Sequence, residues 1–375
     1  MITRAAFPTL FLLACLCLGL IVLLPVTARS ETVRTMLAGS GDRAYENAVI
    51  SEDVTWKGTV IIRGSVVVAP QATLRIDPGA VVRFVGQAGM KKARLVVQGR
   101  LHCAGAPERP VLLGSAYADP RPGDWGGILL LASEKRNLIE QCRIEGADRA
   151  IDARFSNISV KSTAISHSAT AVALRDSTAV IAALSVSGGE TGLDIYDSEV
   201  EIQEGLLQGS RTGIAVRRSG LAMHKVQVKN ISITGLDADE CRIKITSCEF
   251  SSNAVGARLK GGEGQINASR FLKNRDIGLH LAGIRLKIQR SSFDENLRDA
   301  LRTDDGRSTV TGSSFSSNGG FNLVSSGADP VAVSQNWWGG GAESSFLPKF
   351  STSGASIADS IIYSPWLTEK PAGLP

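Results

Sequence analysis

Hydrophobic and polar positions repeat along this chain at intervals of about 21 to 23 residues, a period typical of solenoids. The repeating unit is an apolar residue, two variable residues, a Cys, Ser or Thr, one variable residue and a second apolar residue. Weaker copies centre on Leu184, Gly205 and Val226. The clear copies centre on Cys142, Thr163, Cys248, Ser269, Ser291, Ser313 and, in the last copy, Asn336.

A second column of small residues confirms this register. Each member precedes a short apolar-x-apolar segment, in which alternate side chains of a strand point to the core and to solvent. The column consists of Ala150, Ala171, Gly192, Gly213, Gly235, Gly256, Gly278, Ala300 and Gly320.

A third column holds Asn253, Asn274, Asn296 and Asn318, each three residues after a Phe. Asn tolerates the left-handed backbone conformation and hydrogen-bonds locally, so we expect these residues to form corners.

Each repeat thus supplies two or three strands of a few residues with corners between them. One repeat buries no core by itself, whereas stacking repeats about 4.8 Å apart builds long parallel sheets around a continuous core. The period excludes 33- and 34-residue helical repeats, and the pattern of leucine-rich repeats is missing. The sequence therefore predicts an all-β parallel β-helix of about 21 to 22 residues per turn, or rung.

The composition is typical of a strand-rich protein, and the charge distribution argues against a nucleic-acid partner. The chain has 39 Gly and 5% aromatic residues, which suits short strands and tight turns. Its formal net charge of +5 comes from dispersed Lys and Arg, so nucleic acid is not an expected partner.

The N-terminal segment predicts export. Arg4 precedes an apolar run over residues 7–26, and small residues reach Ala28, where a signal peptidase would cleave. The alternative is an uncleaved helical anchor, since about 20 apolar residues span a bilayer. Either reading places the protein in the periplasm, at the cell surface or outside the cell, with membrane contact only through this segment. We expect a signal or anchor at 1–28, a linker or cap at 29–49, irregular rungs at 50–136, regular repeats at 137–336 and a C-terminal cap at 337–375.

Four cysteines lie outside that segment and show no metal-ligand spacing. Cys142 and Cys248 share a column five rungs apart, too far for a disulfide. We expect four free thiols, with Cys241 and Cys248 left as the alternative pair. Cys103 completes the set.

Outward positions of the apolar-x-apolar strands form a line of charged groups, which we call the ionic stripe. Asp237 and Asp239 are about 7 Å apart on one strand, and cations follow on the next rung. Such a set suits proton transfer, Ca²⁺ binding against a uronate, or simple ion pairing between strands. Asp237, Asp239, Lys260 and His280 are the catalytic candidates. The candidate ligand-binding residues are Asp194, Tyr196, Arg217, Asp237, Asp239, Arg258, Lys260, His280 and Arg302.

The chain resembles the right-handed parallel β-helix proteins of the pectin-lyase-like superfamily, including its carbohydrate-binding and sugar-hydrolase group. The resemblance rests on early and late segments that cover nearly all of the chain beyond the N-terminal run. These are Leu74–Phe84, Leu95–Leu101, Pro110–Val111, Asp124–Ile128, Asn336–Gly339, Ile357–Asp359 and Tyr363–Leu367. It implies a right-handed helix, and it implies lyase, hydrolase, epimerase or non-catalytic functions without choosing among them.

Catalytic motifs of that superfamily are missing or displaced. Arg242-Ile243-Lys244 resembles a polygalacturonase element, but Arg285-Leu286-Lys287 fills the same repeat position two rungs later, which indicates rung pattern. There is no Gly-His-Gly and no DPHD motif. The four histidines fall on different columns, against a His-based metal site.

The sequence therefore favours a non-catalytic solenoid that presents a charged surface to a polysaccharide or an envelope protein, with no cofactor. The alternative is a lyase or hydrolase acting on an acidic glycan. Four of the tryptophans are expected to cover end rungs, where open sheet edges need protection; a sugar-stacking platform is the other interpretation. They are Trp125, Trp337, Trp338 and Trp366.

Overall fold

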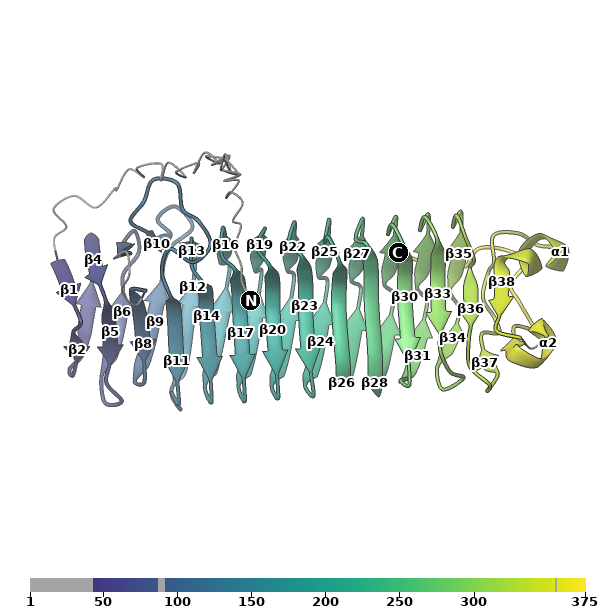
Figure 1. Cartoon of the computed structure of the whole chain (residues 1–375), viewed down its shortest axis with the longest axis horizontal. Helices are drawn as coiled ribbons and strands as arrows, with labels where there is room; N and C mark the ends of the chain where they lie inside the picture. The colour runs from purple at the N-terminus through teal and green to yellow at the C-terminus, as the bar shows by residue number, and fades with distance from the viewer. Residues whose placement is uncertain (1–42, 87–91, 355) are drawn as a thin grey trace, which may run out of the picture. The chain divides into compact units, whose positions relative to one another are not determined.

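Each rung pairs in parallel with the rungs before and after it, as Figure 1 shows. This computed structural model describes residues 43–86, 92–354 and 356–375. The apolar run at 7–26 and the expected cleavage site lie outside these residues. Within the described part, no helix is long and apolar enough to cross a membrane.

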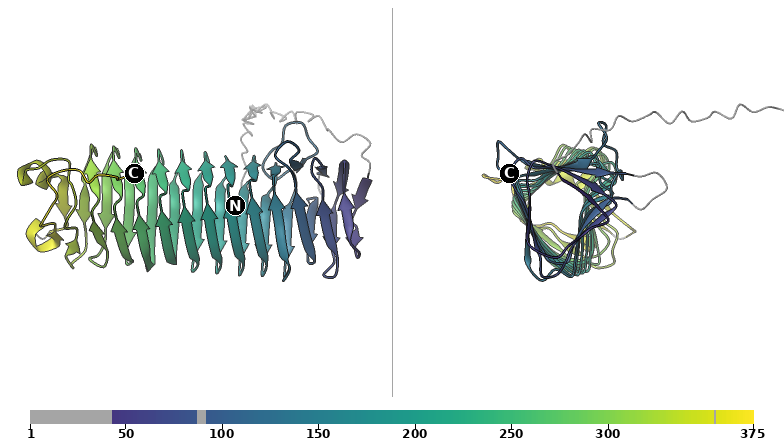
Figure 2. Two further views of the ribbon diagram at one scale, coloured as in Figure 1. Left: turned by 180° about the vertical axis from the view of Figure 1, so that it is seen from behind. Right: turned by 90° about the vertical axis from the view of Figure 1, so that its left-hand side faces the viewer.

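The rungs have three faces, which superpose when viewed along the solenoid axis (Figure 2). Face 1 is a sheet with one strand from each of thirteen turns. Its strands are β1 (Arg43–Glu46), β4 (Thr59–Arg63), β7 (Val81–Val85), β10 (Val111–Ser115), β13 (Cys142–Glu145), β16 (Ala164–Ser166), β19 (Ser185–Ser187), β22 (Leu206–Gln208), β25 (Gln227–Lys229), β27 (Glu249–Ser251), β29 (Arg270–Leu272), β32 (Ser292–Asp294) and β35 (Ser314–Ser316).

Face 2 follows face 1 in each turn. Its strands are β2 (Val49–Ile50), β5 (Ser65–Val68), β8 (Arg94–Val97), β11 (Gly127–Leu131), β14 (Arg149–Arg154), β17 (Thr170–Arg175), β20 (Thr191–Tyr196), β23 (Thr212–Arg217), the first parts of β26 (Thr234–Thr246) and β28 (Val255–Asn267), β30 (Ile277–Ala282), β33 (Asp299–Thr303), β36 (Leu323–Ser325) and β38 (Phe350–Thr352).

Face 3 completes each turn, and β26 and β28 run around the corner that joins it to face 2. Its other strands are β3 (Val54–Trp56), β6 (Thr73–Ile76), β9 (Arg100–Ala104), β12 (Arg136–Glu140), β15 (Asn157–Lys161), β18 (Thr178–Ala182), β21 (Glu199–Gln203), β24 (Gly220–His224), β31 (Arg285–Gln289), β34 (Thr309–Thr311), β37 (Val331–Ala332) and β39 (Ile361–Ile362). Three short helical segments, α1 (Glu343–Phe346), η1 (Leu347–Lys349) and α2 (Ile357–Ser360), lie near the C-terminus.

The register of the strands agrees with the predicted repeat. Ile151 lies opposite Val172, 21 residues on, and Leu279 lies opposite Leu301, 22 residues on. Between β7 and β13 the spacing is longer, 31 residues from Val82 to Leu113 and 31 from Leu113 to Ile144, where loops at 105–110 and 116–126 interrupt the turns.

Each of the three corners of a regular rung is made by a residue with positive φ. In one rung these are Phe155 (φ 50°), Ser162 (φ 44°) and His167 (φ 48°). The residue after each of them points inward, so a polar side chain at that position can form a hydrogen bond with the backbone of the corner. For example, Thr163 donates to the carbonyl of Lys161 at 2.8 Å.

The expected role of the Asn column is wrong in one respect. The left-handed residue at these corners is the one before each Asn, such as Ser252 (φ 57°) or Glu295 (φ 54°). The asparagines are themselves buried and form a ladder along the solenoid. The backbone N–H of Asn274 donates to Oδ1 of Asn296 at 3.1 Å.

We expect Asn296→Ala to lower the free energy of unfolding by about 3 kcal/mol, because it leaves buried polar groups without partners. Asn296 Oδ1 accepts from both the backbone and the side chain of Asn274, and its Nδ2 donates to the carbonyl of Phe271. Chemical denaturation measures the loss. The exposed Asn157 provides the control, and an equal effect of Asn157→Ala would contradict the ladder's role.

One apolar core runs through the solenoid. On face 1 it contains a stack of Phe250, Phe271, Phe293 and Phe315, whose neighbouring ring centroids are 4.7 to 5.2 Å apart. Trp338 continues the stack at 4.4 Å from Phe315.

Three of the tryptophans lie at the C-terminal end, as the sequence predicted. Trp338 and Trp366 pack on Phe346 of α1, and Lys370 lies over the ring of Trp337. Trp125 differs, because it is fully buried in the core and stacks on Phe84 at 3.8 Å.

Candidate functional site

The ionic stripe lies on the outside of face 2 in the predicted register. Asp237 is the strand partner of Arg258, and Arg258 is the partner of His280. Asp239 lies opposite Lys260 in the same pair of strands. The sequence therefore placed these five side chains correctly relative to one another.

Most charged groups of the stripe are engaged in ion pairs between neighbouring rungs. Arg217 donates to Asp237 at 2.9 Å, and Lys260 lies 3.8 Å from Asp239. Arg302 differs, because it contacts the buried carboxylate of Asp299 on its own strand, β33, at 3.2 Å. This pairing matches the ion-pair interpretation of the stripe.

The remaining stripe residues have similar contacts. Arg175 donates to Asp194 at 2.5 Å, and Tyr196 lies beneath the guanidinium of Arg218 at 4.2 Å. His280 lies 3.0 Å from Asp304. Among the described residues Arg258 has no ion-pair partner, and no group of three or more His, Cys, Asp or Glu is arranged to hold a metal ion.

A hollow surface lies on face 3, around the corner from the stripe. It extends over seven rungs, from β18 to β34, and its volume is about 1010 Å³. Two outward columns line it, and we call it the face 3 groove. The first column is Thr178, Glu199, Gly220, Arg242, Glu263, Arg285 and Arg307; the second is Val180, Glu201, Ala222, Lys244, Gln265, Lys287 and Thr309.

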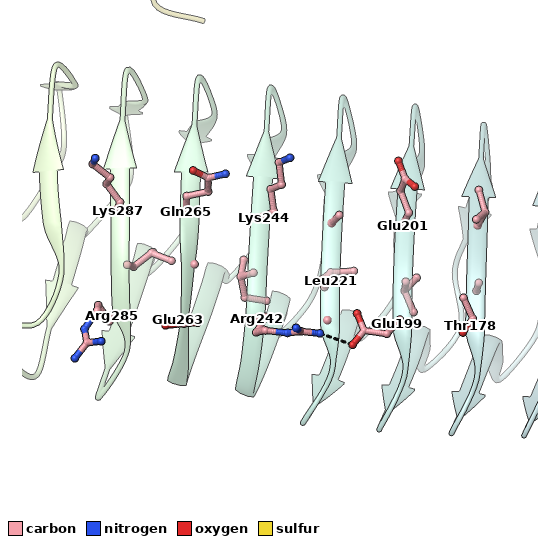
Figure 3. Close-up of a pocket in the computed structure, with 18 of the residues that line it drawn as sticks. Thr178, Glu199, Glu201, Leu221, Arg242, Lys244, Glu263, Gln265, Arg285 and Lys287 are labelled. Atoms are coloured by element: carbon pink, nitrogen blue, oxygen red, sulfur yellow. Dashed lines mark hydrogen bonds and ion pairs between the residues drawn. The ribbon is translucent and has the colours of Figure 1, made fainter.

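Strand β24 forms the lowest part of the groove floor, because both of its lining positions are small. Gly220 and Ala222 stand between the long side chains of the flanking strands. Arg242 reaches across β24 to Glu199, with 2.5 Å between Nη2 and Oε1 (Figure 3). A Cβ at position 220 would lie 2.0 Å from Glu199 Oε2, so glycine makes room for this bridge.

The groove carries more positive than negative side chains. Its acidic lining residues are Glu199, Glu201 and Glu263, and its basic ones are Arg242, Lys244, Arg285, Lys287 and Arg307. Arg242 is paired with Glu199. The other four cations form no salt bridge within the described part of the chain, and all four are exposed. An exposed, unpaired cluster of cations attracts anionic ligands.

The carboxylates of the groove lack the environment of a catalytic acid. Glu199 is 60% exposed and bound to Arg242, and Glu201 accepts from Gln203 at 2.7 Å. A glycosidase acid is instead a carboxyl group held in an apolar pocket, where burial keeps it protonated. The arrangement is suited to binding more than to proton transfer.

Two family models match this chain. The model described as a pectate-lyase like beta helix domain matches residues 48–151, and the one described as a right handed beta helix region matches residues 191–338. The chain is a pectate-lyase-like, right-handed β-helix protein. The fold implied by the sequence resemblance is thereby confirmed.

One solved structure supports the fold of this β-helix protein. A mutant of the periplasmic alginate epimerase AlgG superposes with a TM-score of 0.52 at 14% identity, over 79% of this chain and 76% of that one. PfbA, a surface adhesin of Streptococcus pneumoniae, gives a TM-score of 0.38 at 11% identity, over 81% and 86%. A search of the curated proteins finds no match.

The sequence analysis of this β-helix protein did not predict the groove, although it singled out two segments that line it. Arg242-Ile243-Lys244 and Arg285-Leu286-Lys287 both line it. They were interpreted as rung pattern, which is correct for the backbone, since both segments occupy the same position on face 3. The signal that marks a site is the small pair Gly220 and Ala222 beside them.

Proposed function

We propose that this protein is an exported, non-catalytic β-helix that binds an acidic polysaccharide along the face 3 groove. The observation that carries the proposal is the cluster of unpaired cations Lys244, Arg285, Lys287 and Arg307 on a hollowed face. Export is the expectation from the N-terminal segment, and it places the protein in the cell envelope or outside the cell, where such polymers occur.

The form of the groove favours an extended polymer. Six rung spacings of about 4.8 Å give a length of about 29 Å, enough for several sugar residues in a row. The floor at Ala222, between the long side chains of Glu201 and Lys244, leaves room for a sugar ring, and the exposed apolar side chain of Val180 belongs to the same lining. One fold relative is named an alginate epimerase, and alginate is an acidic polysaccharide, which makes it a suitable first probe.

The surroundings of the acidic residues support a non-catalytic role. Both Glu199 and Glu201 are solvated and engaged by other side chains. On face 2, Asp237 and Asp239 are engaged by cations in the same way. Among the described residues, each of these four carboxyls is in contact with solvent, whereas an acid role requires a carboxyl that apolar burial keeps protonated.

The spacing of the cations predicts a preference among acidic polymers. The pairs Arg242/Lys244 and Arg285/Lys287 are two rungs apart, about 10 Å, with Glu263 on the rung between them. We expect a polymer with an acidic group on every second sugar to bind several-fold more tightly than one with an acid on every sugar, because the latter places a carboxylate beside Glu263. Competition between polymers of equal length checks this, and the reverse order would contradict it.

A glycan array tests the proposal as a whole. The purified chain is applied to acidic and neutral polysaccharides, and each polymer is assayed afterwards for shortened or unsaturated products. The expected result is retention on acidic polymers, weakened by salt, with no products. Product formation would contradict the non-catalytic assignment, and failure to bind any glycan would overturn the proposed function.

A further inference from the structure

Two cysteine thiols far apart in the sequence meet inside the core. Cys103 lies on β9 and Cys142 begins β13, and both are buried. Their Sγ atoms are 3.3 Å apart across a sequence separation of 39 residues. Two sulfur atoms at this distance are in full contact, without an intervening side chain.

The other two cysteines do not share this arrangement. The Sγ of Cys241 donates to the carbonyl of Asp239 at 3.1 Å, and that of Cys248 donates to the carbonyl of Thr246 at 3.3 Å. Both are buried free thiols, as the sequence predicted for all four. The structure gives Cys241 and Cys248 separate backbone partners, so it does not support the alternative disulfide between them.

We propose that Cys103 and Cys142 form a disulfide when the chain folds in an oxidising compartment. Cys142 lies just after β12, the face 3 strand that pairs with β9, so the cross-link would join β9 to the corner between β12 and β13. The chain between the two cysteines holds the loops at 105–110 and 116–126, which interrupt the early turns. The disulfide would therefore fasten the most irregular part of the solenoid, where a smaller share of each turn lies in strands.

The reaction requires an acceptor for two electrons. Both S–H bonds break and one S–S bond forms, which releases two electrons and two protons. The oxidant accepts them as its own disulfide is reduced to two thiols. A dithiol oxidase or oxidised glutathione can serve as this oxidant. Exchange proceeds through a thiolate. In the folded protein the hydrogen bond with Cys142, and then burial, raise the pKa of Cys103, so the bond should form during folding, before the pair is enclosed.

Peptide mapping tests the proposal directly. The chain is unfolded, refolded in a mixture of oxidised and reduced glutathione, blocked with an alkylating agent under denaturing conditions, and digested without reductant. The expected result is one linked peptide pair containing Cys103 and Cys142, with Cys241 and Cys248 alkylated. Alkylation of all four cysteines, or a linked pair involving Cys241 or Cys248, would overturn the proposal.

A thermal measurement gives a second test that does not depend on the variants folding equally well. Reduction of the oxidised protein is expected to lower Tm by roughly 5 °C, because a cross-link that closes a long loop stabilises the fold. Cys103→Ser should make Tm insensitive to reductant, whereas the matched control Cys241→Ser should keep the full shift. A shift of equal size in both variants would contradict the assignment.

Discussion

Replacing Lys244, Arg285 and Lys287 with alanine is expected to lower the affinity for an acidic polysaccharide about a hundredfold. Each exposed cation contributes about 1 kcal/mol to such binding, and about 3 kcal/mol corresponds to two powers of ten. The three side chains are exposed and form no salt bridge within the described residues, so their removal leaves no carboxylate unpaired in the protein. The fold should therefore be unchanged, and the loss is measured by titration at low ionic strength.

Face 2 provides the matched control. The variant with Asp237→Ala, Arg258→Ala and His280→Ala also changes three exposed or half-buried polar side chains, but on the ionic stripe. Its affinity should stay within a few-fold of the wild type. If the stripe variant lost binding and the groove variant kept it, the ligand site would be on face 2.

Phe293→Ala is expected to lower the free energy of unfolding by about 3 to 5 kcal/mol, the usual cost of removing a buried Phe side chain. Its ring lies 4.9 Å from Phe271 and 4.7 Å from Phe315, so the substitution opens a cavity in the middle of the stack. Because neighbouring rungs cannot close that cavity without changing their spacing, relaxation should recover little of the loss.

The exposed Phe155 is the control for this substitution. It lies at a corner of the solenoid and is 63% exposed, so Phe155→Ala should change stability by less than about 1 kcal/mol. Denaturant unfolding of both variants compares them. Equal losses would contradict the proposed contribution of the buried stack.

The fold was predictable because the repeat fixes both period and register. Once Cys142 and Thr163 are aligned, each side chain between them falls on a known face, and the structure confirms the strand partners of the ionic stripe. The same reasoning found the Asn column but not its burial, and it assigned the left-handed conformation to the wrong residue, because the repeat pattern does not distinguish the corner residue from the next one.

Other features depend on contacts that a repeat does not encode. The repeat pattern did not reveal a column of serines at one corner. Ser156, Ser177 and Ser198 each accept a hydrogen bond from a backbone N–H of the preceding rung. The groove arises because Gly220 and Ala222 happen to coincide with long neighbours and with Arg242 reaching across them. The contact of Cys103 with Cys142 crosses irregular rungs, where counting residues gives no register.

Lysine footprinting tests most directly whether the face 3 groove is the ligand site. The protein is acetylated with and without an acidic polysaccharide, and modification is measured by peptide mass spectrometry. Lys244 and Lys287 line the groove, whereas Lys260 is 69% exposed on face 2. The account predicts that the polymer protects Lys244 and Lys287 and leaves Lys260 unchanged. Protection of Lys260, with Lys244 and Lys287 still reactive, would contradict it.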